Sequence, residues 1–509
     1  MLNLKPHSIL LFFFVFVSTI KAQDSISLFQ KTNNQYSIER NFRSQFYYNP
    51  ANMSDYSSSS FSELNAGYHQ NDKKVYREQL GSGDKGLTVT ANSFLKPKEN
   101  RAIWGNAFYQ NLKKQPFKWN ESLDYERIAP YVSADSVGGS LNVERYFFQG
   151  GLSQKIKRWT IAGEISYLAQ LGYRSRDPRL KSTTSDLNVK AGVNYRLYKE
   201  YELGVFANFN KYTQNSTLIF KSELGKPYVY QMVGLGISNY FFSGGTNPKN
   251  TFEEFGYKGG FQISNKQGRD FYVRAVAGKS INSKNHSDNG LVSNYETSEL
   301  ENKNFEIEGA KFFTIQNNHR IGALANYRAI VRTGYEFGYS VNNNSADAIF
   351  KRKSYRLENF ISTFKVLYQY NQENFTLAAS PFFAMEEIKE RNLYPVSGQK
   401  FEYLHFGISA NYRQRINNSQ AISIEPYYSQ RKVQNSINAL ATLENNTLNN
   451  WVQNDFIYQA SQISTFGANV RYDIKLEKLP AFFIDLQYQT QAIQKKNNNF
   501  VGASVGITF

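Results

Sequence analysis

The chain ends with NFVGASVGITF, residues 499–509, and this stretch decides the fold. Apolar side chains occupy every second position in it: Val501, Ala503, Val505, Ile507 and Phe509. Glycine, serine and threonine stand between them, so the two faces of an extended strand here differ in polarity. Because chain ends usually fray, an alternating strand at the terminus indicates an end that is hydrogen-bonded to another strand.

The same period of two recurs along the chain in blocks of about 9 to 16 residues. Clear examples are DLNVKAGVNYRLY (186–198), EYLHFGISANYRQR (402–415) and ISTFGANVRYDIK (463–475). Between the blocks, short connections alternate with long polar ones. The short connections fall near 96–100, 156–157, 199, 267–268, 316–317, 371–372, 416–418 and 477–479. The long ones fall near 70–85, 111–142, 170–186, 213–251, 282–302, 333–354, 388–399 and 434–459.

Short turns on one side and long loops on the other are typical of a transmembrane antiparallel up-and-down β-barrel. A count of the blocks gives about 18 strands, with 16 or 20 as alternatives, and an even number places both termini on the periplasmic, short-turn side. Lipid cannot satisfy an unpaired backbone group, so the sheet must close. We therefore expect the last strand to pair with the first, FSELNAGYH at 61–69. We expect 213–251 to be a folded extracellular loop rather than one more hairpin.

The N-terminus has the pattern of a secretory signal peptide, residues 1–22. Lys5 supplies positive charge, the apolar run from Ile9 to Ile20 is too short for a membrane helix, and Ala22 offers a cleavage position. We expect residues 23–60 to form a periplasmic N-terminal segment that could plug the lumen. Residues 61–509 are expected to form the barrel in the outer membrane.

The amino-acid composition excludes several kinds of functional site. The 36 tyrosines and 40 phenylalanines suit strands and membrane interfaces. Cysteine is absent, which excludes disulfides, thiolate metal sites and a lipidated cysteine. The five histidines are scattered, so we expect no metal site and no cofactor. His405 and Ser409 share the inward face of one block, but no nucleophile elbow, HExxH or P-loop occurs, and we expect no enzyme.

Projection of the alternation inward predicts a set of lumen-lining residues, mostly basic. They are Lys190, Arg196, Arg274, Arg328, Lys365, Arg413, Arg471, Glu425, Asp473 and Asp485. A charged side chain in a water-filled lumen destabilises the barrel little, whereas on the lipid side it destabilises the barrel by several kcal/mol. With the formal net charge of +17, this set has two interpretations. The lumen is a pore or pocket that favours anions, or the charges form ion pairs that brace the wall.

A second basic group lies in the connection 170–188. It consists of Arg174, Arg176, Arg179 and Lys181 around Asp177 and Pro178. Arginine grips phosphate or carboxylate in bidentate fashion, so the group could contact a ligand or lipopolysaccharide. The alternative is an internal brace, in which Asp177 pairs with a neighbouring arginine.

Two stretches resemble known outer-membrane proteins. The NPA tripeptide in FYYNPANM (46–53) is similar to the N-terminal region of several barrel families from Bacteroidota. YRSRDPR (173–179) followed by TTSDLNVKAGVNYRLY (183–198) resembles one such family, an outer-membrane β-barrel domain of unknown function. The terminal Phe509 is similar to the signal that barrel-insertion machinery recognises. The resemblance implies a fold and a location, with no substrate or catalytic residues.

These observations lead to two functional hypotheses. The first is a channel or transporter for small polar or anionic solutes, because about 18 strands can leave an aqueous lumen. The alternative is a docking or assembly barrel that holds surface or secretion partners through its long extracellular loops. The partners expected are outer-membrane lipid, lipopolysaccharide, the insertion machinery and a surface or periplasmic protein. The basic residues are dispersed, so nucleic acid is not among them.

Overall fold

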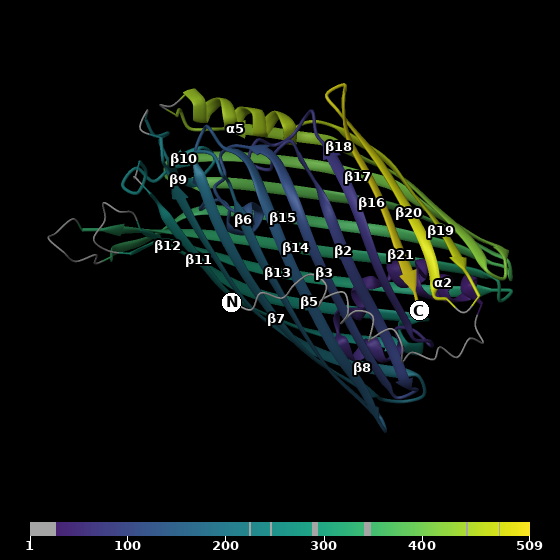
Figure 1. The fold of residues 1–509 in the computed structure, drawn as a ribbon. Coiled ribbons are helices and arrows are strands. Elements are labelled where there is room, and N and C mark those ends of the chain that lie inside the picture. The colour runs from purple at the N-terminus through teal and green to yellow at the C-terminus, as the bar shows by residue number, and fades with distance from the viewer. Residues whose placement is uncertain are drawn as a thin grey trace, which may run out of the picture.

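A computed structural model describes residues 27–222, 225–244, 247–287, 294–340, 348–443, 446–477 and 479–509. Eighteen strands form one closed antiparallel sheet (Figure 1). Each strand is hydrogen-bonded to the barrel strands that precede and follow it in the chain, and the first strand is hydrogen-bonded to the last. The predicted signal peptide lies outside the described residues. A closed sheet leaves no unpaired edge, which makes this architecture suitable for spanning a bilayer. The prediction of an 18-stranded outer-membrane-type barrel is confirmed.

The strands of the barrel are β1 (Phe61–Asp72), β2 (Gly83–Lys98), β3 (Arg101–Phe117), β5 (Gly139–Ile156), β6 (Trp159–Tyr173), β7 (Arg179–Arg196), β8 (Tyr201–Ile219), β11 (Lys249–Asn265), β12 (Phe271–Ser287), β13 (Tyr295–Ile315), β14 (His319–Tyr339), β15 (Ala348–Asn371), β16 (Phe375–Leu393), β17 (Val396–Asn417), β18 (Gln420–Ala439), β19 (Ile463–Lys475), β20 (Ala481–Ile493) and β21 (Lys496–Thr508). A small second sheet contains β4 (Ser133–Ala134), β9 (Tyr230–Gly234) and β10 (Ile237–Ser238). The helices are α2 (Leu28–Gln35), α3 (Ile38–Phe42), η1 (Ser44–Tyr48), η2 (Pro50–Asp55), α4 (Tyr125–Ile128), η3 (Lys266–Gly268) and α5 (Asn446–Gln459). Among the described residues, no helix is both long and apolar enough to cross a membrane.

The barrel closes between its first and last strands, as predicted. β1 and β21 pair without interruption from Glu63 opposite Thr508 to Asp72 opposite Asn499. The backbone N–H of Phe509 donates to the carbonyl of Ser62 at 2.9 Å. The terminal residue is therefore held in the sheet, which explains the alternation with which the chain ends.

The connections follow the predicted order, but two of those expected to be long are short. The β6–β7 connection, expected near 170–186, contains only residues 174–178, because both strands continue further than the alternation indicated. β8 continues to Ile219, and the chain returns as β11 only at Lys249. The residues between them contribute β9 and β10 to the small sheet, so 213–251 adds no transmembrane hairpin and the preference for a folded loop is confirmed. The connection expected near 388–399 is not a long loop. β16 and β17 pair as far as Leu393 and Val396, which leaves a tight turn at Tyr394 and Pro395.

The wall of the barrel is uneven in height. β15 has 24 residues, whereas β1 has 12 and β19, β20 and β21 have 13 each. β18 pairs with β19 only as far as Arg431 and continues to Ala439 beyond it. The extra length of the tall strands therefore lies at the extracellular rim.

The outer face is apolar, as a lipid-facing surface requires. On β20, Leu486 points outward with 52% of its surface exposed, while the adjacent Gln487 faces the lumen. We expect Leu486→Arg to lower the free energy of unfolding in bilayers by about 2–4 kcal/mol, because the guanidinium would enter hydrocarbon. Gln487→Arg, one position away, is the matched control and should cost far less. Equal destabilisation of the two variants in urea titrations would contradict this orientation.

Candidate functional site

Residues 27–56 lie inside the barrel at its short-turn end (Figure 1). α2 contacts β17, β18 and β19, α3 contacts β15, and η2 contacts β3, β5, β6 and β7. These strands lie on different sides of the cylinder, so the segment crosses the lumen. We call residues 27–56 the luminal segment. Phe42 and Phe46 of this segment pack in one hydrophobic cluster with Leu324, Leu367 and Ala378 of the wall.

The NPA tripeptide joins the luminal segment to the wall. The side chain of Asn49 accepts a hydrogen bond from the backbone of Ala51 at 3.0 Å and so caps η2, with Pro50 in its first turn. The amide nitrogen of Asn49 donates to Asn194 on β7 at 2.9 Å. A Cβ on Gly192 would come within 2.0 Å of the Asn49 amide oxygen, so only glycine leaves room for this contact. Asn52 exchanges a reciprocal pair of hydrogen bonds with Gln262 on β11, at 3.1 and 2.8 Å.

Arginines of the wall hold the other side of the luminal segment. Arg471 on β19 donates to the Tyr36 hydroxyl at 2.6 Å and to the Glu63 carboxylate at 3.0 Å. It also pairs with Asp473 at 2.8 Å, and its guanidinium lies 3.6 Å from the centroid of the Phe483 ring. Arg413 on β17 donates to the carbonyl of Thr32 at 3.4 Å. Hydrogen bonds and ion pairs therefore fasten the segment around the circumference.

The extracellular end is covered by a second assembly, the cap. It consists of the β3–β5 connection with α4, the loop 220–248 and α5. Trp119 of the first part stacks on Trp451 of α5, with ring centroids 5.2 Å apart. Met232 of the loop 220–248 belongs to the same buried cluster. Segments far apart in the sequence thus share one core above the lumen.

Arg127 of α4 anchors the cap to the wall. Its guanidinium pairs with Asp186 on β7 at 2.8 Å and with Glu254 on β11 at 3.0 Å. It also lies 3.8 Å from the centroid of the Tyr212 ring. Burial alone would lower the pKa of Arg127, but Glu254 and Asp186 raise it above its ordinary value, so the group stays charged. On the other side of α4, Arg332 of β14 donates to the carbonyl of Glu126 at 2.7 Å.

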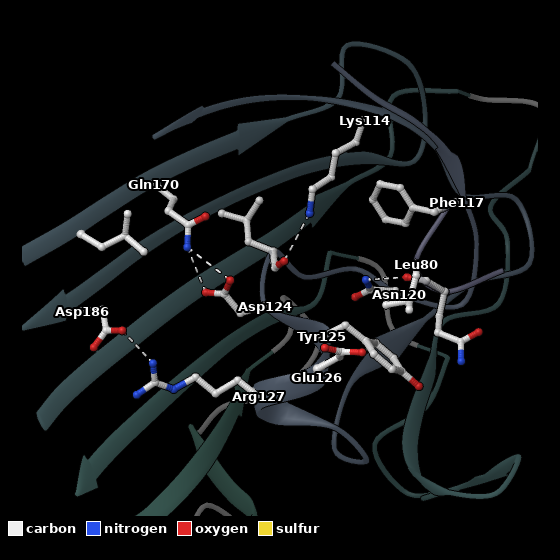
Figure 2. A pocket seen from close by; sticks show the side chains of 13 residues that line it. Leu80, Lys114, Phe117, Asn120, Asp124, Tyr125, Glu126, Arg127, Gln170 and Asp186 are labelled. Carbon is white, nitrogen blue, oxygen red and sulfur yellow. Dashed lines mark hydrogen bonds and ion pairs between the residues drawn. The ribbon is translucent and has the colours of Figure 1, made fainter. Parts of the chain in front are cut away.

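Two cavities meet at α4 inside the barrel, with volumes of about 410 and 460 Å³. They share Glu126, Arg127 and Asp186 in their linings, and together we call them the α4 chamber. Figure 2 shows the first of them, with Arg127 directed at Asp186, and Asp124 accepting two hydrogen bonds from Gln170 at 3.1 and 3.2 Å. Each volume is within the range of small-molecule sites.

Three basic side chains continue the lining from the α4 chamber toward the luminal segment. Lys258 lines the second cavity, as does Ile330 of β14. Arg328 is the next inward-facing residue of β14, toward the short-turn end. Lys365 of β15 lies opposite Leu324, which packs against the luminal segment. Within the described part of the chain, these three side chains form no hydrogen bond or salt bridge, and Glu306 lies opposite Arg328 in the sheet. A Cβ on Gly278 would come within 2.5 Å of the Lys258 side chain, so this glycine gives the lysine its space. A column of three basic side chains therefore borders the lumen on the β11–β15 side, with Glu306 and Glu254 near Lys258.

The predicted lumen-lining residues occupy two different surroundings. Arg274, Arg413, Arg471, Asp473 and Glu425 belong to the ion pairs around the luminal segment. Lys190 pairs with Glu164 at 2.7 Å and lies over the ring of Tyr48, whereas Arg196 lies 3.7 Å from Glu202 at the short-turn end. Asp485 is buried and accepts from Gln487 at 3.0 Å. Arg328 and Lys365 form no salt bridge among the described residues. The paired members of the set brace the wall, and a pore or pocket that favours anions stays a prediction.

The basic group of the β6–β7 connection is divided in the structure. Arg174 is buried and pairs with Glu121 of the cap at 3.1 Å. Arg179 pairs with Asp177 at 2.8 Å, and Asp177 also accepts two backbone N–H bonds, from Lys221 and Ser222. Arg176 and Lys181 are exposed. The four side chains therefore do not form one cluster, and two of them act as internal braces.

His405 pairs with Glu386 at 2.9 Å. In the described ranges, no hydroxyl is hydrogen-bonded to its ring, so Ser409 is not oriented by it. Groups of three or more histidine, aspartate or glutamate side chains that could hold a metal are likewise absent from the described residues.

Lys258, Arg127 and Glu254 were missed by the sequence analysis. Lys258 could have been found, because Phe255, Tyr257 and Phe261 alternate on its strand and assign it to the inner face. Arg127 belongs to a connection without periodicity. Its partners come from three other strands, and no local signal identifies them.

No curated protein matches the chain. Among solved structures, it is similar to the siderophore receptor PiuA from Acinetobacter baumannii, with 7% identity, TM-score 0.41, and 88% of this chain and 82% of that chain covered. For the ferric citrate transporter FecA, the identity is 8%, the TM-score 0.41 and the coverage 88% and 78%. For a FadL homologue from Pseudomonas aeruginosa, these values are 11%, 0.35, 91% and 93%.

A family model matches residues 50–509, from the proline of the NPA tripeptide to the terminal phenylalanine. The match includes the RDPR and TSDL stretches and every strand of the barrel. The chain belongs to the family of unknown function DUF6850.

Proposed function

We propose that this barrel transports a small anionic solute across the outer membrane through a gated lumen. The observation that carries the proposal is the column formed by Lys258, Arg328 and Lys365, which leads from the α4 chamber to the luminal segment. Its members form no salt bridge among the described residues, although Glu306 lies opposite Arg328 in the sheet. Positive side chains along a water-filled path attract anions and lower the barrier to their passage. Export through a signal peptide cleaved after Ala22, and an origin in Bacteroidota, belong to the same proposal.

The gate in this proposal is the luminal segment. Beside the hydrophobic clusters around Phe46 and Ala51, the segment makes many polar contacts with the wall. Polar contacts exchange with water at low net cost compared with buried apolar surface. The α4 chamber holds the solute on the extracellular side of the gate. Movement of residues 27–56 then opens the path to the periplasm.

Uptake into proteoliposomes that contain the full chain tests the proposal. We expect Arg328→Glu and Lys258→Glu each to slow the entry of radiolabelled succinate about five- to tenfold, because a negative charge replaces a positive one beside the path. Lys211→Glu makes the same charge change on the outer face, where this exposed lysine pairs with Glu253 at 3.4 Å, and should leave the rate unchanged.

Three results would count against anion transport. The first is entry of succinate, phosphate and chloride no faster than into empty liposomes. The second is an equal effect of Arg328→Glu and Lys211→Glu. The third is faster entry of choline than of succinate.

A second candidate is the docking barrel, which the exposed aromatics of the cap favour. Tyr240 and Phe241 project from the loop 220–248, with 88% and 47% of their surfaces exposed. Aromatic side chains at such positions are enriched in protein interfaces. In this case a protein partner would remain bound after mild detergent extraction, and a Tyr240→Ser/Phe241→Ser variant would lose it. Migration of the wild-type chain alone in native gels would exclude the candidate.

A further inference from the structure

A third cavity lies on the opposite side of the lumen, bordered by β18–β21 and β1. Its volume is about 670 Å³. Seven asparagine and glutamine residues line it: Asn71, Asn469, Gln487, Gln489, Gln491, Asn498 and Asn499. We call it the amide cavity. Lys73 is the one charged residue in its described lining, in contrast to the α4 chamber.

The amides of this cavity are suited to a ligand that both donates and accepts hydrogen bonds. Each carries an acceptor oxygen and two donor hydrogens in one plane. The oxygen of Asn469 is buried and has no hydrogen-bond partner among the described residues. Native structures rarely leave such an atom unpaired, so a hydroxyl supplied from inside the cavity would complete it.

Other amides are fixed in position and leave the cavity surface preformed. Asn498 accepts from the backbone of Lys74 at 2.7 Å and donates to the carbonyl of Val75 at 2.8 Å. Gln487 donates to Asp485 at 3.0 Å. Because these side chains are held by the wall and by the β1–β2 connection, little conformational entropy is lost when a ligand binds them.

Aromatic rings provide flat apolar surfaces beside the amides. Phe500 stacks on His69, with ring centroids 5.7 Å apart and planes inclined by 24°. Tyr427 lies against Gly467, where a Cβ would come within 2.4 Å of its ring, and its hydroxyl donates to Gln489. Tyr458 of α5 also contributes to the lining. Alternating polar amides and immobile ring faces match a molecule with hydroxyl groups at its edge and C–H groups on its faces.

We infer that the amide cavity binds a neutral saccharide. The planar amides pair with neighbouring hydroxyls, the rings of Phe500 and Tyr427 pack on the C–H faces of a sugar, and nearly absent charge favours a neutral ligand over an anion. The site is separate from the column of Lys258, Arg328 and Lys365. A result that contradicts saccharide binding therefore does not contradict the anion transport proposed above, and the reverse also holds.

Calorimetry on the full chain tests this inference, in a detergent without a sugar headgroup. The probes are three neutral trisaccharides, built from glucose, mannose and xylose. We expect at least one to bind, and we expect Asn469→Ala and Phe500→Leu each to weaken that binding about fivefold or more. Both substitutions face the lumen and remove few packing contacts, and heat-modified electrophoresis checks that the variants fold.

Two controls separate this site from the α4 chamber. Asn304→Ala removes an amide from the lining of the α4 chamber and should leave trisaccharide affinity unchanged. Arg328→Glu should also leave it unchanged, although the same change slows anion entry. The inference would be overturned if none of the three trisaccharides bound, or if wild type, Asn469→Ala and Phe500→Leu bound them equally. Either result would show that the amide cavity holds only water.

Discussion

Deletion of residues 27–56 should expose the inner wall at the short-turn end to large reagents. Ala378 of β16 is buried against the luminal segment, and the natural chain contains no cysteine, so Ala378→Cys introduces a single thiol with little change in volume. In detergent, we expect a polymer-linked maleimide to label this thiol at least about tenfold faster when the segment is deleted, because labelling of the full chain requires a local opening.

Lys303→Cys provides the control for this experiment. The Lys303 side chain is 63% exposed on the outer face, so a thiol there should react at the same rate with and without the luminal segment. A deletion variant that folds, as judged by heat-modified electrophoresis, but keeps Ala378→Cys unreactive would show that the segment does not close this end of the lumen.

The substitution with the largest expected effect on stability is Arg471→Ala. It would leave the carboxylates of Glu63 and Asp473 buried without their common partner, and a charge left unpaired in this way costs about 3–5 kcal/mol. The same change removes the hydrogen bond to Tyr36 and loosens α2. We therefore expect a lower midpoint of thermal unfolding in detergent, measured by loss of the heat-modified band.

Two further variants make this prediction specific. Arg415→Ala removes a half-buried arginine at the short-turn end, whose side chain donates a hydrogen bond to Asn418 and forms no ion pair in the described structure, and should have little effect. Addition of Glu63→Gln and Asp473→Asn to Arg471→Ala should restore part of the stability, because the unpaired charges disappear. If the single and the triple variants unfold at the same temperature, the loss is due to packing and not to charge.

The barrel itself could be predicted from the sequence because its information is local. Leu404, Phe406 and Ile408 alternate with His405 and Gly407, and this pattern alone assigns each side chain to lipid or lumen. Closure followed from Phe509 and the first strand, since an open edge is not tolerated in lipid. The lumen-facing charges were found in the same way.

The cap could not be predicted, because its structure depends on contacts between distant segments. α5 has the composition of a polar loop, and only the packing of Trp451 on Trp119 shows why it is helical and where it lies. Arg174 seemed to belong with Arg176 and Arg179. It turns inward instead, because Glu121 from another connection provides a buried partner. Proximity in the sequence does not reveal such a division.

The uneven height of the wall has a consequence for how molecules reach the mouth. The strands from β13 to β18 are long and form the high part of the extracellular rim. β19, β20, β21 and β1 are shorter and form its low part. A bulky polymer at the cell surface therefore has less of the wall to cross on the low side than on the high side. The amide cavity lies directly behind the low part of the rim, so its approach from that side is less obstructed than from the side of the tall strands.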